Sequence, residues 1–265
     1  MSPLSSGCIA LGNNRLIVII VNVSLNYYNR FMVNFRTLFG TEPSSIQKTC
    51  VIVPFLMPGL LRALGIASLK NGKLFATTHT DTFTFIKAGI GTLFVGDAVL
   101  YLEETACQEM IYFGACGLVQ ETDRLTIGSL VSPHKCLAFE GFTDVLLRHT
   151  NKITTHGPDQ ELFQSFLKTT PDHHIQPVTG MSIGSLRCEE SYKEFFDKSG
   201  VGVVDMECSA FFSAANSIKR KAVALLYATD IIGKTSFFEP SEPKDKSRID
   251  HAIQTACNAI QLFCR

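Results

Sequence analysis

Two carboxylates follow apolar runs and could exchange protons with a bound molecule. Glu207 comes after residues 203–206 (VVDM) and precedes small residues, and Asp230 follows the uncharged run 222–228. A carboxyl group at the end of a buried strand loses hydration, which raises its pKa and lets it hold a proton near neutral pH. The structural alternatives are a helix N-terminal acid for Glu207 and a capping or turn acid for Asp230.

Two glycine-containing segments, 88–91 (AGIG) and 114–117 (GACG), offer a second kind of chemistry. Glycine lets backbone N–H groups approach an anion or a sugar closely. Each segment taken alone is explained equally well as a tight turn after a strand, so neither identifies a site by itself.

Strands that alternate with helices would position these residues. We expect strands at 50–54, 83–87, 110–113, 202–204 and 222–227, and helices at 93–107, 205–215 and 249–263. The last helix carries one apolar stripe with spacings of three and four. This order predicts an α/β fold with three layers (αβα) and a twisted mixed central sheet. Ligands of such sheets gather where strands end and chains turn into helices.

Taken together, these motifs resemble the superfamily of purine nucleoside phosphorylases, uridine phosphorylases and methylthioadenosine nucleosidases. Residues 203–210 (VVDMECSA) resemble its Met-Glu-Ser/Ala-Ala motif, and 227–230 (YATD) its later Ser-Asp element. Segments 111–117 (IYFGACG), 127–131 (IGSLV) and 88–91 resemble its glycine turns and its "Gly-Asp" strand start. The likeness runs in order over roughly residues 48–262. It implies a phosphorylase/hydrolase-like domain at 47–265, preceded by an N-terminal extension, 1–46, of uncertain role.

The resemblance implies cleavage of the N-glycosidic bond of a nucleoside, with a purine favoured as the base. Such cleavage builds positive charge on the ribose, as in glycoside hydrolysis. Glu207 would bind the ribose hydroxyls with Met206 packed against the sugar, and Asp230 would be the general acid toward the leaving base. The other residues expected to bind substrate are Gly89, Gly114, Ala115, Gly117, Ser182 and Arg187.

The acceptor of the sugar stays open between phosphate and water. Family phosphorylases carry an Arg and a Ser or Thr where this chain has Tyr112 and Ala115, and Arg62 is the one candidate replacement. A dianion without a guanidinium loses its strongest hydrogen bonds. Family nucleosidases place a Glu after the first strand, which residues 54–61 lack, although Glu140 could substitute. A nucleoside-binding or storage protein without turnover is the alternative function.

The base specificity rests on the same comparison. The Gln and Arg of uridine phosphorylases would fall near Glu189 and Ser191, so a pyrimidine-specific site is not indicated. We therefore expect a purine nucleoside as the small-molecule partner, with phosphate as a possible co-substrate and no other cofactor.

Composition narrows the partners further. Lys plus Arg equals Asp plus Glu at 24 each, which gives no reason to expect nucleic acid or an acidic membrane surface.

The nine cysteines are scattered without a C-x-x-C, which favours unpaired thiols and the cytoplasm. The pair His173-His174 lacks a second ligand pair, so no metal is expected. The apolar run 16–23 (LIVIIVNV) is too short for a membrane span and is expected to be an extra strand, or to lie upstream of a start at Met32. The resemblance alone implies a homo-oligomer.

Overall fold

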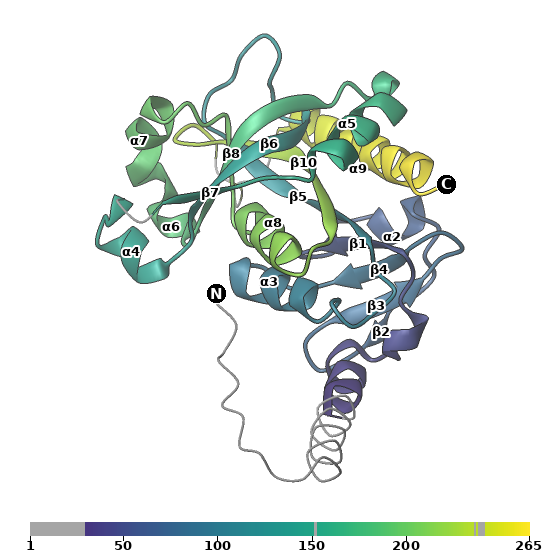
Figure 1. The fold of residues 1–265 in the computed structure, drawn as a ribbon. Coiled ribbons are helices and arrows are strands. Elements are labelled where there is room, and N and C mark those ends of the chain that lie inside the picture. The colour runs from purple at the N-terminus through teal and green to yellow at the C-terminus, as the bar shows by residue number, and fades with distance from the viewer. Residues whose placement is uncertain (1–29, 151–152, 236, 238–241) are drawn as a thin grey trace, which may run out of the picture.

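The computed structural model describes residues 30–150, 153–235, 237 and 242–265 (Figure 1). The strand expected at 16–23 lies outside these residues. Within them, no helix combines the length and the apolar character that crossing a bilayer requires.

Ten strands of the described residues form one mixed sheet. The strands are β1 (Thr49–Val53), β2 (Lys70–Asn71), β3 (Ala76–His79), β4 (Thr84–Lys87), β5 (Glu109–Leu118), β6 (Leu130–Phe139), β7 (Thr154–His156), β8 (Gln176–Ile183), β9 (Val203–Asp205) and β10 (Lys221–Ile231). The pairings of β1 with β4 and of β5 with β1 and β10 are parallel, whereas β3 with β4 and β5 with β9 are antiparallel.

Helices cover both faces of this sheet (Figure 1). Helices α3 and α8 pack together on one face, and α2, α5 and α9 pack on the other. The expected three-layer α/β fold is thereby confirmed. The helices are α2 (Leu60–Ala63), α3 (Thr92–Leu100), α4 (Phe142–Leu146), α5 (Gln160–Thr169), α6 (Leu186–Glu189), α7 (Lys193–Lys198), α8 (Cys208–Ser217) and α9 (Pro243–Phe263), with 3-10 turns at Pro43–Ser45, Pro171–His173 and Glu190–Tyr192.

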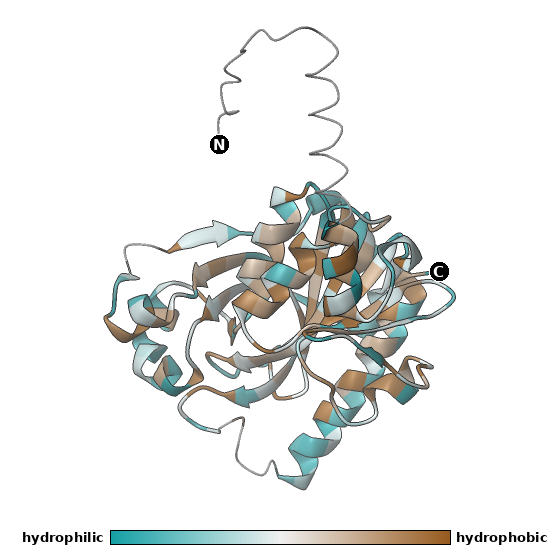
Figure 2. Ribbon diagram, turned by 90° about the horizontal axis from the view of Figure 1, so that it is seen from below, coloured by the Kyte–Doolittle hydropathy of each residue, from teal (hydrophilic) through white to brown (hydrophobic). Residues whose placement is uncertain are grey.

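The central strands are apolar along their length because both of their faces are covered. In β1, Cys50 and Ile52 point to the core beside α3 and α8, whereas Val51 and Val53 point to the core beside α2 and α9. Strands β5 and β10 alternate in the same way. Figure 2 shows hydrophobic residues concentrated in the strands and in the helix sides that face them. This alternation fixes which side chains of each strand can face α8.

Five strands close into a ring, because β10 pairs with β6, β6 with β8, β8 with β9, β9 with β5, and β5 again with β10. Several expected boundaries change. The helix expected from residue 205 begins at Cys208, and the last helix, expected from residue 249, begins at Pro243. Segment 114–117 is part of β5 and not a turn, β10 continues through Asp230, and the helix expected to reach residue 107 ends at Leu100. Strands β5 and β10 extend through these positions because they pair with each other there.

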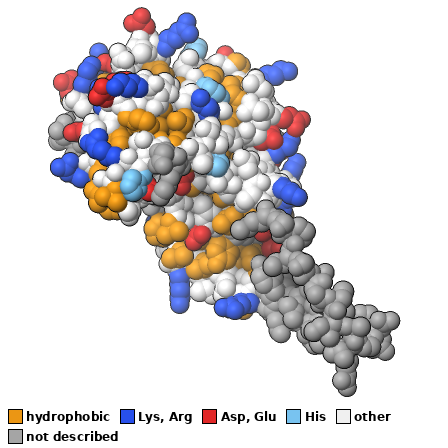
Figure 3. Space-filling model, turned by 60° about the vertical axis from the view of Figure 1, so that its left-hand side comes forward, with side chains coloured by type: hydrophobic (Ala, Val, Ile, Leu, Met, Phe, Trp, Pro, Cys, Tyr) orange, Lys and Arg blue, Asp and Glu red, His pale blue; other side chains and the backbone are white. Residues whose placement is uncertain are grey.

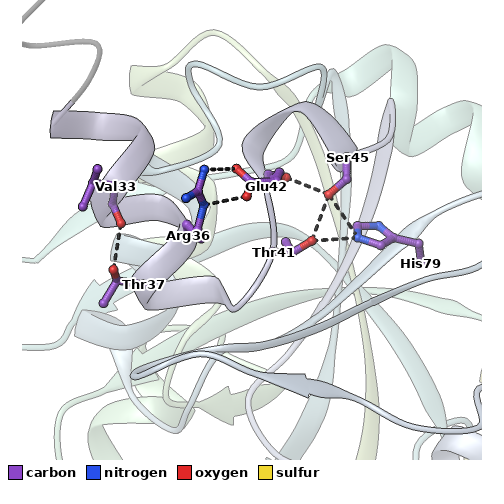
Figure 4. A network of polar contacts seen from close by, with 7 residues as sticks. All are labelled: Val33, Arg36, Thr37, Thr41, Glu42, Ser45 and His79. Atoms are coloured by element: carbon purple, nitrogen blue, oxygen red, sulfur yellow. Dashed lines mark hydrogen bonds and ion pairs between the residues drawn. The ribbon is translucent and has the colours of Figure 1, made fainter.

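Residues 30–46 contribute to the core of the same domain. A helix ends at Phe39, and the rings of Phe35 and Phe39 are fully buried and stack with centroids 4.2 Å apart. Beyond this helix, Nε2 of His79 lies 3.2 Å from the Thr41 hydroxyl and 3.3 Å from the Ser45 hydroxyl (Figure 4). The segment is thus held beside β3 by the packing of Phe39 against Phe75, which precedes that strand, and by the polar cluster at His79.

We expect Phe39→Ala to lower the free energy of unfolding by about 3–5 kcal/mol, because the cavity left beside Phe35 and Phe75 cannot collapse fully. Urea denaturation followed by circular dichroism measures this difference. Val33→Ala, on the exposed side of the same helix, is the matched control and should change stability by less than about 0.5 kcal/mol. Equal, small effects of both substitutions would show that residues 30–46 are not part of the core.

Candidate active site

A pocket of about 510 Å³, part of it open to solvent, lies where β5, β9 and β10 end and where α3, α6 and α8 begin. Its position agrees with the rule that ligands of α/β sheets bind at strand ends. Its lining residues are Phe55, Ile90, Ala115, Cys116, Gly117, Leu186, Glu189, Val204, Asp205, Met206, Glu207, Thr229, Asp230 and Phe237.

Glu207 is buried at one end of this pocket and is held from two elements. Its Oε1 accepts the backbone N–H of Gly91 at 2.6 Å, and its Oε2 accepts the hydroxyl of Tyr112 at 2.9 Å. Burial raises the pKa of Glu207 to about 7, the nearby Asp205 adds to the rise, and the two hydrogen bonds oppose it. The carboxyl group is therefore fixed in direction, and burial favours its protonated form.

A second buried acid fixes the backbone that carries Glu207. Oδ2 of Asp205 accepts the N–H groups of Glu207 and Cys208 at the start of α8, and its Oδ1 accepts the Ser182 hydroxyl at 2.5 Å. Ser182 in turn accepts the N–H of Ser209 at 2.9 Å. Unpaired N–H groups at a helix start need such acceptors. Ser182 therefore positions Asp205 and α8 and does not line the pocket.

Tyr112 fills the space beneath Glu207. Its side chain is fully buried and packs against Phe211 of α8, with ring centroids 5.5 Å apart. A Cβ placed on Gly114 would lie only 2.7 Å from the Tyr112 hydroxyl oxygen. Gly114 is thus required so that the phenol can cross over β5 and reach Glu207. This glycine makes room for a side chain and not for a ligand.

Asp230 reaches the opposite end of the pocket through an irregularity in β10. The register of β10 against β5 shifts between Ala228 and Asp230, so that Thr229 is the extra residue of a bulge. The Thr229 hydroxyl donates to Oδ1 of Asp230 at 2.6 Å. Burial raises the pKa of Asp230, and the Thr229 hydrogen bond partly offsets that rise.

Glu189, at the end of α6, faces the same end of the pocket as Asp230. Burial, together with the negative charges of Asp230 and Glu190, raises the pKa of Glu189 to about 8. The pocket thus contains four acids with raised pKa values, Asp205, Glu189, Glu207 and Asp230. Among the described residues that line it there is no Lys or Arg.

Apolar side chains form the remaining walls. Phe55 after β1 and Phe237 meet edge to face, with ring centroids 6.3 Å apart, and Ile90, Met206 and Leu186 complete the lining. Flat apolar walls with a few fixed polar groups at the ends suit an aromatic ring system joined to a polar group.

The structure brings some of the predicted site residues together and leaves others apart. Glu207, Asp230, Met206, Ala115 and Gly117 all line the pocket. Four predicted residues do not line it: Gly89 precedes the lining residue Ile90, Gly114 is covered by Tyr112, Ser182 lies behind Asp205, and Arg187 is exposed and lines an adjoining cavity. The two alternative residues also lie outside the pocket. Arg62 is exposed on α2, and Glu140 forms a hydrogen bond with Ser209.

Sequence reasoning missed the lining residues Glu189, Phe55, Ile90 and Thr229 as functional groups. The sequence comparison marks Glu189 only as lying near the positions of the Gln and Arg of uridine phosphorylases. No sequence signal marks its approach to Asp230, because the two residues are 41 positions apart on different elements. In the part of the chain that the structure describes, no cluster of His, Cys, Asp and Glu could hold a metal ion.

Solved structures with the same fold are similar to this chain only at low sequence identity. The 5′-methylthioadenosine/S-adenosyl homocysteine nucleosidase of Campylobacter jejuni superposes with a TM-score of 0.64 at 14% identity, over 82% of this chain and 98% of that one. AMP nucleosidase from Bacteroides thetaiotaomicron superposes with a TM-score of 0.64 at 14% sequence identity, over 88% of this chain and 97% of that one. Uridine phosphorylase from Vibrio fischeri superposes with a TM-score of 0.66 at 15% sequence identity, over 83% of this chain and 91% of that one. These likenesses show the fold.

The family of this chain is established by its sequence rather than by the structural likenesses. No curated protein matches the chain. A sequence profile of the phosphorylase superfamily matches residues 67–265, which include every residue that lines the pocket except Phe55. The chain belongs to the phosphorylase superfamily.

Proposed function

We propose that this chain hydrolyses the N-glycosidic bond of a nucleoside, with a purine favoured as the leaving base. The observation that carries the choice of water over phosphate is the hydrogen bond from Tyr112 to Glu207, with the phenol filling the space over Gly114. The apolar walls of the pocket support a nucleoside as the ligand. Its acids at both ends support chemistry on the bond that joins sugar and base.

Glu207 would act on the sugar. Cleavage makes the ribose resemble an oxocarbenium ion, and a carboxylate that accepts hydrogen bonds from the ribose hydroxyls binds more strongly as that charge develops. Each carboxylate oxygen can accept more than one hydrogen bond, so the bonds from Gly91 and Tyr112 leave capacity for a ligand. These two bonds also hold the group still, which avoids reorganisation during the reaction.

Asp230 would act on the base. When the glycosidic bond breaks, its electron pair goes to the base, and a proton placed on a ring nitrogen, most naturally N7 of a purine, makes the base a better leaving group. Burial favours the protonated form of Asp230, which is the form that a general acid needs.

The charge of the pocket supports water as the acceptor. A phosphate dianion would meet Glu207, Asp205, Glu189 and Asp230 without a guanidinium or ammonium partner among the described lining residues. Such an ion pays a large desolvation penalty that only charge-assisted hydrogen bonds offset. A neutral water molecule carries no such penalty.

The test is release of free base from a panel of purine and pyrimidine nucleosides, with and without inorganic phosphate. We expect release that does not depend on phosphate, with free ribose as the second product. Asp230→Asn should lower kcat by about 10²–10⁴-fold because the proton donor is lost. Asp97→Asn, exposed on α3, is the matched control and should leave kcat unchanged.

Release that requires phosphate and yields ribose 1-phosphate would refute hydrolysis. A wild-type protein that binds nucleosides but releases no base would make it a nucleoside-binding protein instead.

Protein stability should fall as the pH rises through neutrality. The pKa values of Glu207 and Glu189 are raised to about 7 and about 8 in the folded state, so folding binds protons. The stabilisation is complete below the unfolded-state pKa and is lost as the pH rises through these folded values. We expect the Tm of wild type to drop between about pH 5 and about pH 8, and to drop less in Glu207→Gln. Glu121→Gln, exposed in a loop, should follow wild type in thermal scans. Parallel curves for all three proteins would contradict this assignment.

We also propose a homo-oligomer that works in the cytoplasm. Exposed apolar side chains lie on α3 beside the pocket, at Leu93 and Phe94, and on α4 at Phe142 and Leu146. Figure 3 shows hydrophobic clusters on this side of the molecule. The described cysteines are all unpaired, which suits a reducing compartment. Light scattering should give a mass above the 29.2 kDa of one chain, and cell fractionation should find the protein in the cytosol.

A further inference from the structure

Two carboxyl groups approach each other across one glycine at the base end of the pocket. A Cβ placed on Gly117 would lie 3.0 Å from Oδ2 of Asp230 and 3.4 Å from Oε1 of Glu189. The missing side chain therefore leaves both oxygens facing the same small space above β5. The two oxygens are therefore no farther apart than the sum of these two distances, a range over which one bridging water can link two carboxyl groups.

The two groups differ in their other contacts. Asp230 accepts the Thr229 hydroxyl, which stabilises its anion. Among the described residues, none donates a hydrogen bond to the Glu189 carboxyl, and the groups that face it are the carboxylates of Asp230 and Glu190 and the buried thiol of Cys116. Arg187 lies on the same short helix, is exposed, and lines an adjoining cavity together with Glu189 and Asp230, although it donates no hydrogen bond to either carboxyl group. A single proton on the pair would therefore reside mainly on Glu189.

We propose that Glu189 and Asp230 form a carboxyl pair that shares one proton, with Glu189 as the group that stores it for delivery to the leaving base. This inference rests on the proposed function and adds a second proton-holding group to it. The pKa of Glu189, about 8, supports it, because ionising both groups would place two negative charges on either side of one glycine. The titration belongs to the pair as a whole.

The step balances with water as the one co-reactant. The pair gives its proton to a ring nitrogen of the base while the electron pair of the C1′–N bond moves onto the base. The oxygen of water forms a bond to C1′ and loses a proton, which replaces the one that the pair delivered. Nothing is oxidised or reduced, and the pocket returns to its starting charge.

The first test is the pH profile of kcat/KM for wild type, Glu189→Gln and Glu190→Gln. Wild-type activity should fall above about pH 8, where the pair loses its shared proton. In Glu189→Gln, Asp230 must hold the proton alone, so this alkaline limb should move at least about one pH unit lower. Activity at about pH 8 should then drop about tenfold or more, and most of it should return at about pH 5.5. Glu190→Gln removes one of the negative charges that face Glu189 but leaves the pair intact, so it should move the alkaline limb by less than Glu189→Gln does.

An alkaline limb that stays in place in Glu189→Gln, with only KM raised, would overturn the inference, because Glu189 would then only bind the base.

The second test needs no turnover and separates the two proposals. In ligand-free protein with ¹³C-labelled glutamate carboxyls, one signal should titrate near pH 8 and vanish in Glu189→Gln. Asp230→Asn should move that titration to lower pH, because a like charge is removed. The Glu207 signal is assigned separately through Glu207→Gln. A Glu189 signal that titrates as an ordinary exposed glutamate would refute the pair. If the titration appears as expected but the protein releases no base, the carboxyl pair is supported and the proposed function is refuted.

Discussion

The hydrogen bonding of one buried carboxylate, Glu207, sets the conditions that the rest of the site meets. A buried anion needs donors, and Glu207 receives them from Gly91 at the start of α3 and from Tyr112 on β5. Asp205 aligns α8 beneath it in the same way. Three elements distant in sequence must therefore pack correctly before the group points into the pocket. The polar contacts thus tie the site to the α3–α8 face of the sheet.

The acids of the pocket have pKa values that are raised so that their protonated, uncharged forms are favoured. Glu207, Glu189 and Asp230 all have raised pKa values because burial penalises their anions and no described basic side chain compensates in the lining. Such groups reduce stability at and above neutral pH, a cost that functional sites commonly carry. In return, they can hold protons near neutral pH.

Ring closure and one irregular residue bring the two ends of the site together. Strand β5 pairs with β9 and with β10, so the strand ends that carry Glu207 and Asp230 lie on either side of it. The bulge at Thr229 then turns Asp230 toward Gly117 and Glu189. A regular strand would point the Asp230 side chain to the other face of the sheet.

The layered α/β fold could be predicted from the residue pattern, because β-branched and apolar runs between helical segments admit few other arrangements. The same pattern indicated Glu207 and Asp230 through their positions after such runs. Three further facts emerged from the folded chain: Gly114 accommodates Tyr112, Ser182 supports Asp205 from behind, and Glu189 faces Asp230. These facts depend on strand register, on a bulge and on contacts between distant elements, which local spacing does not encode.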